Sequence, residues 1–304
     1  MTAHSRYRLA IALVFITPAL WSVNALVARS APGVIEPHVL ALMRWLTASL
    51  LFALGAHAQL WTHRRAIAQD WKHYLMLGAL GMWICGAWVY IGGRTTGAVN
   101  ISLIYSVSPV LIVVFSALWL REKITMWQTC GVALALAGVV HVVLKGQWTT
   151  LAKVQFVPGD GWILAATLSW TVYSLLLKQW RSPLGPSARL AVISFAGSCV
   201  ILPFAIWEAL HSPLPVLTPR GAGLALTAAV VPGYCAYLAY SVMQRELGAA
   251  RVSVVLYLAP LYAAVMAWLV LAEPLQAHHA WGMALVLPGI YLVTRQTTKR
   301  QAQL

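Results

Sequence analysis

Ten long apolar runs take up most of this 304-residue chain. An α-helix needs about 20 apolar residues to cross roughly 30 Å of hydrocarbon, and only a helix or a closed barrel satisfies its own backbone in lipid. The runs show no alternation of period two, so they predict helices rather than strands. We therefore expect an all-α integral membrane protein with ten transmembrane helices. The ten expected spans are Leu9–Ala28, Trp45–His63, Tyr74–Gly93, Thr95–Leu120, Ile124–Leu144, Gly161–Leu177, Leu190–Trp207, Gly221–Gln244, Val252–Ala272 and Pro274–Thr294.

Basic residues outnumber acidic ones, with 21 Lys and Arg against 7 Asp and Glu. A nucleic-acid footprint would gather the basic residues on one soluble face. Here they lie between the spans instead. With the N-terminus in the cytoplasm, fifteen fall on the cytoplasmic side, five fall outside and Arg44 lies within a span. Because cytoplasmic segments of membrane proteins carry such an excess, the pattern predicts both termini in the cytoplasm and no nucleic-acid partner.

The second half of the chain repeats the first. Pro109 and Glu122 recur as Pro260 and Glu273, each 151 residues further along. Self-similarity at a fixed offset indicates a duplicated structural unit. Further matched pairs at this offset are Arg94 and Arg245, Gly97 and Gly248, Ser102 and Ser253, Gly131 and Gly282, and Gly138 and Gly289; an offset of 149 aligns Leu20–Arg29 with Ser169–Lys178, and Pro37 with Pro186.

The repeat divides the expected helices into two units of five, residues 1–149 and residues 150–304. Because five is odd, the second unit must enter the membrane from the opposite side, which makes the repeats inverted. Inverted repeats recur in secondary transporters, where the substrate site lies near the midplane between the halves and one half rocks against the other. We therefore expect two inverted five-helix repeats around a central cavity.

Both units carry a proline near the middle of an expected span, Pro109 in the fourth and Pro260 in the ninth. A proline inside a helix removes one backbone hydrogen bond and bends the helix. One interpretation makes the two prolines hinges that open and close the mouths of the cavity. The other makes them static bends that shape the bundle, and the sequence leaves both open.

The order of proline, glutamate, Gln-x-x-Gly and a further glycine resembles the EamA-type members of the drug/metabolite transporter superfamily, over nearly the whole chain. The abundance of tryptophan and tyrosine is similar to the YddG-like branch, which exports aromatic amino acids. The resemblance implies spans one to four and six to nine around a central cavity, spans five and ten at the side, and a place in the bacterial inner membrane. The residues that carry it are Pro109, Glu122, Gln128, Gly131 and Gly138, then Pro260, Glu273, Gly282 and Gly289.

Aromatic side chains recur on shared helix faces inside the spans. Trp21 and Asn24 are three residues apart, and their counterparts Trp170 and Tyr173 have the same spacing. One interpretation is a pocket in which a flat apolar ring stacks, and the alternative is bulky packing between helices. The candidate substrate-binding residues are Trp21, Asn24, Trp83, Tyr90, Tyr105, Trp170, Tyr173, Tyr234 and Tyr257.

Arg44, at the start of the second expected span, is the one charged residue that we expect inside the hydrocarbon. Such residues face the protein interior, where they are paired or functional. Arg44 is therefore either a contact for a substrate carboxylate or part of a structural pair. All seven acidic residues lie near or beyond span ends, so no carboxylate is placed at the midplane to exchange protons. This disfavours antiport of cationic drugs and favours a neutral or zwitterionic small molecule.

We expect a transporter that exports aromatic or other apolar amino acids by alternating access through an aromatic-lined cavity. A broader metabolite or drug exporter of the same superfamily is the alternative. An enzyme is not expected, because the sequence has no His/Glu helix motif, phosphate-binding loop or carboxylate pair. We expect neither cofactor nor metal; the partners are a small-molecule substrate and the lipid bilayer, and the oligomeric state is left open.

Overall fold

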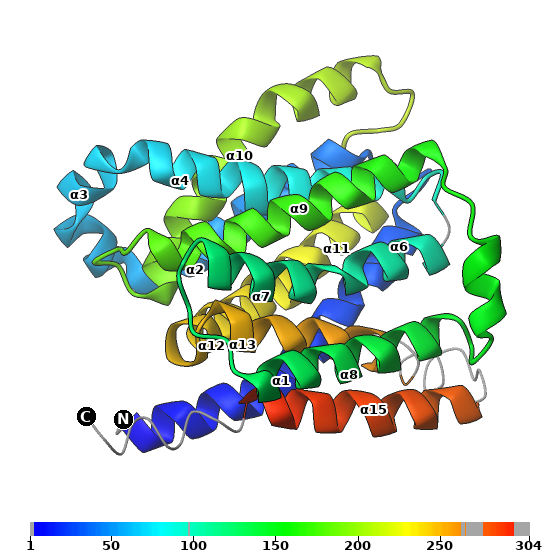
Figure 1. The fold of residues 1–304 in the computed structure, drawn as a ribbon. Helices are drawn as coiled ribbons and strands as arrows, with labels where there is room; N and C mark the ends of the chain where they lie inside the picture. The colour runs from blue at the N-terminus through cyan, green and yellow to red at the C-terminus, as the bar shows by residue number, and fades with distance from the viewer. Residues whose placement is uncertain (1–2, 97, 263–264, 266–275, 295–304) are drawn as a thin grey trace.

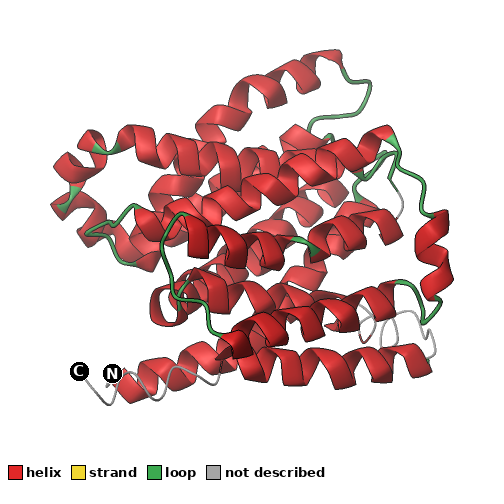
Figure 2. Ribbon diagram, in the orientation of Figure 1, coloured by secondary structure: helices red, strands yellow, loops and turns green. Residues whose placement is uncertain are grey.

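The computed structural model describes residues 3–96, 98–262, 265 and 276–294, and in these residues every regular element is a helix (Figure 2). Glu273 and Pro274 fall outside the described residues. The α-helices are α1 (Ala3–Ser30), α2 (Pro37–Thr62), α3 (Arg64–Gln69), α4 (Trp71–Gly78), α5 (Val89–Gly92), α6 (Ala98–Ser106), α7 (Ser108–Leu118), α8 (Met126–Val143), α9 (Pro158–Gln179), α10 (Pro186–His211), α11 (Pro219–Ala228), α12 (Ala236–Leu247), α13 (Ala249–Ser253) and α15 (Ala277–Thr294). Two π-helical segments, η1 (Ala79–Trp88) and η3 (Ala229–Cys235), and two 3₁₀ segments, η2 (Trp148–Lys153) and η4 (Val254–Leu258), complete the set.

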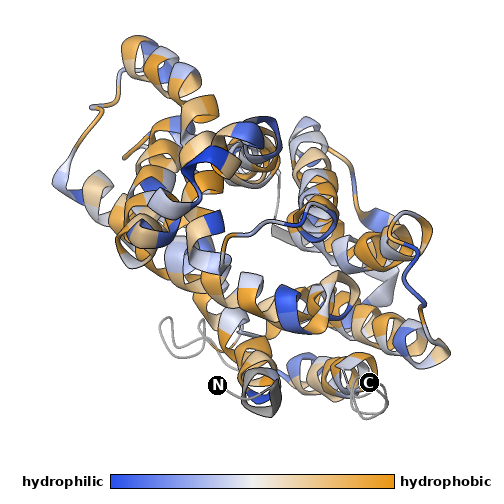
Figure 3. Ribbon diagram, turned by 90° about the vertical axis from the view of Figure 1, so that its left-hand side faces the viewer, coloured by the Kyte–Doolittle hydropathy of each residue, from blue (hydrophilic) through white to orange (hydrophobic). Residues whose placement is uncertain are grey.

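The outside of the bundle is apolar. Leu50, Leu54, Leu118, Phe195 and Leu226 are all exposed, and hydrophobic residues run along the helices in Figure 3. Water does not tolerate an apolar surface of this extent, whereas lipid does. Within the described residues, seven helical stretches are long and apolar enough to cross a membrane: Tyr7–Ala28, Pro37–Thr62, Trp71–Gly92, Asn100–Leu118, Met126–Val143, Pro186–His211 and Pro219–Leu247.

Helix α2 begins eight residues before the expected span. We expected the second span to start at Trp45, because the apolar run was cut at Arg44. The helix begins instead at Pro37, a residue suited to the first turn because it has no N–H to leave unpaired. Arg44 is therefore an interior residue of a long helix. Its charge comes to lie within the protein.

The fourth expected span is two helices rather than one. Helix α6 ends at Ser106 and α7 begins at Ser108, with Pro109 in its first turn. In the ninth expected span, α13 is followed by the 3₁₀ segment η4, and Pro260 comes two residues after that segment ends. The proline ring cannot continue the preceding helix, so each expected span changes geometry shortly before its proline.

Helices α8 and α15 lie side by side and pack mainly against each other (Figure 1). Four glycines form the crossing. A Cβ atom on Gly138 would lie 2.8 Å from the carbonyl oxygen of Gly282, and one on Gly131 would lie 2.6 Å from that of Gly289. Small residues let helix backbones approach closely in membranes. Spans five and ten therefore make their close contact within one chain.

Helices α2 and α10 form another extensive contact, and each one caps the start of the other. Glu208, in the last turn of α10, accepts a hydrogen bond from the backbone N–H of His38 at 2.7 Å. Gln59, near the end of α2, accepts one from the backbone N–H of Gly185 at 3.0 Å. The two helices are therefore antiparallel. A side chain at the end of each satisfies N–H groups that the partner's first turn leaves free.

Candidate functional site

A buried polar group joins α1, α2 and α5. Arg44 is 4% exposed, and its Nη1 donates hydrogen bonds to Oδ1 of Asn24 at 2.9 Å and to the hydroxyl of Tyr90 at 3.1 Å. The Tyr90 hydroxyl in turn donates to Asn24 Oδ1 at 2.8 Å. The structure thus brings together three of the residues predicted from sequence. Both partners of Arg44 are neutral, so its positive charge has no carboxylate beside it among the described residues.

Aromatic rings form a central cluster between α1, α9 and α12. The rings of Trp21 and Trp170 meet edge to face with centroids 5.8 Å apart, and Trp170 stacks on Tyr173 at 5.4 Å. Tyr240 lies 5.4 Å from Trp21 and 5.1 Å from Trp170, and Tyr237 lies 6.3 Å from Trp21. Edge-to-face and offset contacts of this kind each contribute about 0.5–1.5 kcal/mol beyond area burial.

Trp45 connects the cluster to Arg44. The guanidinium carbon of Arg44 lies 4.5 Å from the centroid of the Trp45 ring, a cation–π contact, and that ring lies 4.8 Å from Tyr237. The cluster, defined here as Trp21, Trp45, Trp170, Tyr173, Tyr237 and Tyr240, therefore has a cation at its edge. A small molecule that carries both a ring and an anionic group could therefore place its ring among the aromatic side chains and its anionic group on Arg44.

Several N–H groups in this region have no acceptor. Nε of Arg44, Nε1 of Trp45 and Nε1 of Trp170 are buried and donate to no protein atom. An unpaired buried donor costs about 1–3 kcal/mol, so the arrangement is unfavourable unless a ligand supplies acceptors. All three unpaired groups donate, which points to a ligand rich in oxygen.

Two of the predicted residues lie outside the central cluster. The ring of Trp83 stacks on Phe204 of α10 with centroids 4.6 Å apart, and the ring of Tyr234 packs on Phe52 of α2 at 4.7 Å. Both rings pack between helices, Trp83 against α10 and Tyr234 against α2.

The two tyrosines that precede the prolines lie at the helix breaks. Tyr257 is within η4 and is buried, and its hydroxyl has no partner. Tyr105 is partly buried near the end of α6, four residues before Pro109. Each predicted hinge therefore has an aromatic ring close to it.

The π-helical segment η1 faces the aromatic cluster. The Tyr237 hydroxyl donates to the carbonyl of Gly81 at 3.4 Å, and Ser169 Oγ donates to that of Leu80 at 2.9 Å. A Cβ atom on Gly81 would lie 2.7 Å from the ring of Tyr173, so glycine lets that ring close against the helix. π-helical turns are frequent at functional sites because they interrupt the regular bonding of a helix.

Sequence reasoning left Trp45, Tyr237 and Tyr240 out of the candidate set. Tyr237 is three residues after the candidate Tyr234, and Tyr240 is three residues after Tyr237, so this spacing was available as a signal. Trp45 directly follows Arg44, and neighbouring residues on a helix point in different directions. Its contact with both Arg44 and Tyr237 depends on how α2 packs, which no local pattern gives.

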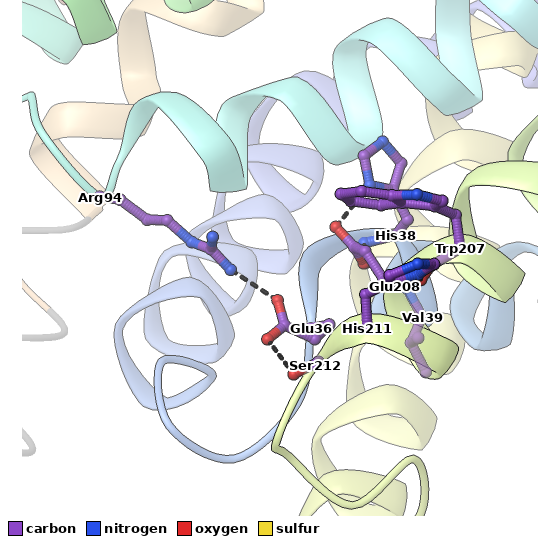
Figure 4. Close-up of polar contacts among 8 residues, drawn as sticks. All are labelled: Glu36, His38, Val39, Arg94, Trp207, Glu208, His211 and Ser212. Atoms are coloured by element: carbon purple, nitrogen blue, oxygen red, sulfur yellow. Dashed lines mark hydrogen bonds and ion pairs between the residues drawn. The ribbon is translucent and has the colours of Figure 1, made fainter.

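Polar contacts tie three segments together at one end of the bundle (Figure 4). Glu36 accepts from Arg94 at 2.7 Å and from Ser212 at 2.6 Å, and Glu208 accepts from the ring of His38 at 2.6 Å. Burial on its own would raise the pKa of Glu36, but the hydrogen bonds from Ser212 and Arg94 outweigh it and hold that pKa below its usual value. The contact therefore stabilises the fold at neutral pH and is lost as acid protonates Glu36.

An ion pair connects the segment after α7 to the end of α9. Lys178 donates to Glu122, which follows α7 by four residues. The pair of Glu36 and Arg94 belongs to the separate group described above.

The described residues thus form a multi-pass helical membrane protein with a buried polar and aromatic site. The model of the EamA-like transporter family matches residues 8–144 and 157–295, and the chain belongs to this family. It is a transporter of the drug/metabolite transporter superfamily. One solved structure, titled "Crystal structure of protein", has a TM-score of 0.74 with 19% identity and covers 94% of this chain and 97% of its own, which shows the fold alone.

Two curated relatives are named as transport proteins. An "Uncharacterized transporter" of Archaeoglobus fulgidus is 25% identical, over 93% of this chain and 96% of that protein. A "Probable terminal-alkyne amino-acid exporter" of Streptantibioticus cattleyicolor is 27% identical, over 87% of this chain and 86% of that protein. These names point to transport and away from catalysis.

Proposed function

We propose that the protein exports aromatic or other apolar amino acids by alternating access. The observation that carries the proposal is the buried Arg44 guanidinium, which has only neutral hydrogen-bond partners and lies at the edge of an aromatic cluster. The substrate carboxylate binds Arg44, and the apolar side chain stacks among the rings. The relative from Streptantibioticus cattleyicolor, named as an amino-acid exporter, supports this substrate class.

Within this proposal the predicted residues take different roles. Asn24 and Tyr90 hold the guanidinium in place, and Trp21, Trp170 and Tyr173 contact the substrate ring. The rings now touch one another, so the substrate must separate them to bind. Trp83, Tyr105, Tyr234 and Tyr257 surround the route to the cluster.

The transport cycle requires two inverted halves, residues 1–149 and 150–304, with five helices in each. Two observations support this arrangement: the family model matches the chain twice, and Gln59 and Glu208, which are 149 residues apart, make equivalent caps. Both termini then lie in the cytoplasm, and the inner membrane of a bacterium is the proposed location.

The prolines act as hinges in this proposal. Pro109 and Pro260 follow the two places where helical geometry changes, and discontinuous helices are the moving parts of many transporters. Replacing both with alanine will lower the turnover of purified protein in liposomes at least tenfold while binding affinity stays within about twofold. A static bend predicts near-normal turnover from a variant that folds, and such a result would rule out the hinge.

Flux of labelled amino acids tests the function directly. Purified protein in liposomes will move tryptophan and phenylalanine at least tenfold faster than threonine, because threonine has no ring to stack in the cluster. The measurement is made with and without a pH gradient. Equal rates for threonine and tryptophan would favour the alternative, a broader metabolite or drug exporter.

A further inference from the structure

Negative charge is missing around Arg44. Five of the seven acidic side chains have polar partners elsewhere in the described residues, Glu246 lies in the last turn of α12, and Glu273 lies outside the described residues. The five pairs are Glu36 with Arg94, Asp70 with His73, Glu122 with Lys178, Asp160 with Asn100, and Glu208 with His38.

Two acceptors beside the cluster are already in use. Asn24 Oδ1 accepts from both Arg44 and Tyr90, and the Gly81 carbonyl accepts from Tyr237. The unpaired groups, by contrast, are the N–H donors of Arg44, Trp45 and Trp170. A carboxylate offers about four acceptor sites and no donor, whereas an ammonium group offers three donors and no acceptor. The unpaired donors match the first group and repel the second.

Charge leads to the same conclusion. An empty site carries the uncompensated charge of Arg44, a carboxylate anion brings the total to zero, and a zwitterion leaves it at plus one. Buried charges are tolerated when they are paired, so the neutral complex is the most stable of the three.

We propose that the site recognises a ring and a carboxylate but not an ammonium group, so its preferred substrates are apolar aromatic monocarboxylate anions. The inference rests on the proposed function, because it uses the same site, and it moves the preferred substrate from the amino acid to the aromatic carboxylate that lacks the ammonium group. Export of an anion can also be driven by the membrane potential, without a coupled ion. A membrane potential of 100 mV, negative inside, expels a monovalent anion toward a gradient of roughly 50-fold.

Three ligands that share a phenyl ring but differ in their charged groups test the carboxylate and the ammonium group separately. Binding of 3-phenylpropanoate, phenylalanine and 2-phenylethylamine to the purified full chain is measured by calorimetry. We expect 3-phenylpropanoate to bind about tenfold more tightly than phenylalanine, because phenylalanine buries an ammonium group without a partner, and we expect no binding of 2-phenylethylamine. Phenylalanine binding as tightly as 3-phenylpropanoate, or any binding of the amine, overturns the inference and leaves amino-acid export standing. If none of the three binds, the proposed function fails as well.

Asn24→Asp provides a matched variant, because it puts a carboxylate of the same size beside Arg44. The variant will lose at least tenfold in affinity for 3-phenylpropanoate, since the guanidinium is then neutralised from within. Retained affinity in a variant that still melts cooperatively contradicts the proposal. Efflux of 3-phenylpropanoate from liposomes, corrected with protein-free liposomes, will rise when an inside-negative potential is imposed, and a rate independent of potential is a further contrary result.

Discussion

Arg44→Gln will raise the KM for phenylalanine transport about 100-fold. Removing one member of a buried charged hydrogen-bonded pair costs about 2–5 kcal/mol, and each 1.4 kcal/mol is a factor of ten. Arg44→Lys will recover part of the loss, because lysine keeps the charge but lacks the planar fork that holds a carboxylate with two bonds. Initial rates in liposomes over a range of phenylalanine concentrations give the KM of each variant.

The same variant distinguishes a substrate contact from a structural pair. Arg44 has no carboxylate partner among the described residues, so its removal relieves a buried cation and will leave the melting temperature unchanged or higher. A structural role predicts the reverse: a lower melting temperature with an unchanged KM. Arg94→Gln is the control, because Arg94 pairs with Glu36 in the separate polar group of Figure 4 and not with Arg44 or the cluster, and its KM will stay within about twofold.

Gly138→Val will destabilise the protein by roughly 3 kcal/mol or more, near the upper end of what overpacking costs. The new Cβ would lie 2.8 Å from the Gly282 carbonyl oxygen, and a backbone carbonyl in a helix has no alternative rotamer. Helices α8 and α15 must therefore move apart along their whole contact. Thermal unfolding in detergent and the yield of monodisperse protein measure the effect.

Gly55→Val is the matched control. Gly55 also lies inside a helix, but a Cβ atom there would meet no atom within 4 Å. Valine at this site will leave the melting temperature within a few degrees of the parent protein. If Gly138→Val is equally harmless, the close crossing of α8 and α15 is not what holds them together.

Sequence reasoning predicted the helical fold because the need to satisfy backbone groups in lipid leaves few alternatives. It predicted the start of the second span wrongly, at Trp45 instead of Pro37, because a charge was treated as a boundary. Lipid excludes charge only from the helix face that it touches, and Arg44 faces the protein. The sequence predicted a bend at Pro109, but not that two separate helices would meet between Ser106 and Ser108, since an apolar run looks the same whether its helix is continuous or interrupted.

Part of the candidate site was predictable residue by residue, but its assembly was not. Asn24 and Arg44 were singled out as polar residues inside the membrane, and Tyr90 as an aromatic residue on a shared helix face. Their mutual hydrogen bonds depend on how three helices rotate against one another, which is a property of the whole bundle. For the same reason Trp83 and Tyr234, chosen on spacing, pack against α10 and α2 outside the cluster.

The reciprocal caps of Gln59 and Glu208 have a mechanical consequence. An antiparallel pair fastened at both ends resists lengthwise sliding, since a shift of one residue would break both caps together. During transport, α2 and α10 would then move together as one rigid unit. In the proposed alternating-access cycle, the movement that opens each side of the cavity is then assigned to the helices that are already broken, α6 with α7 and α13 with η4.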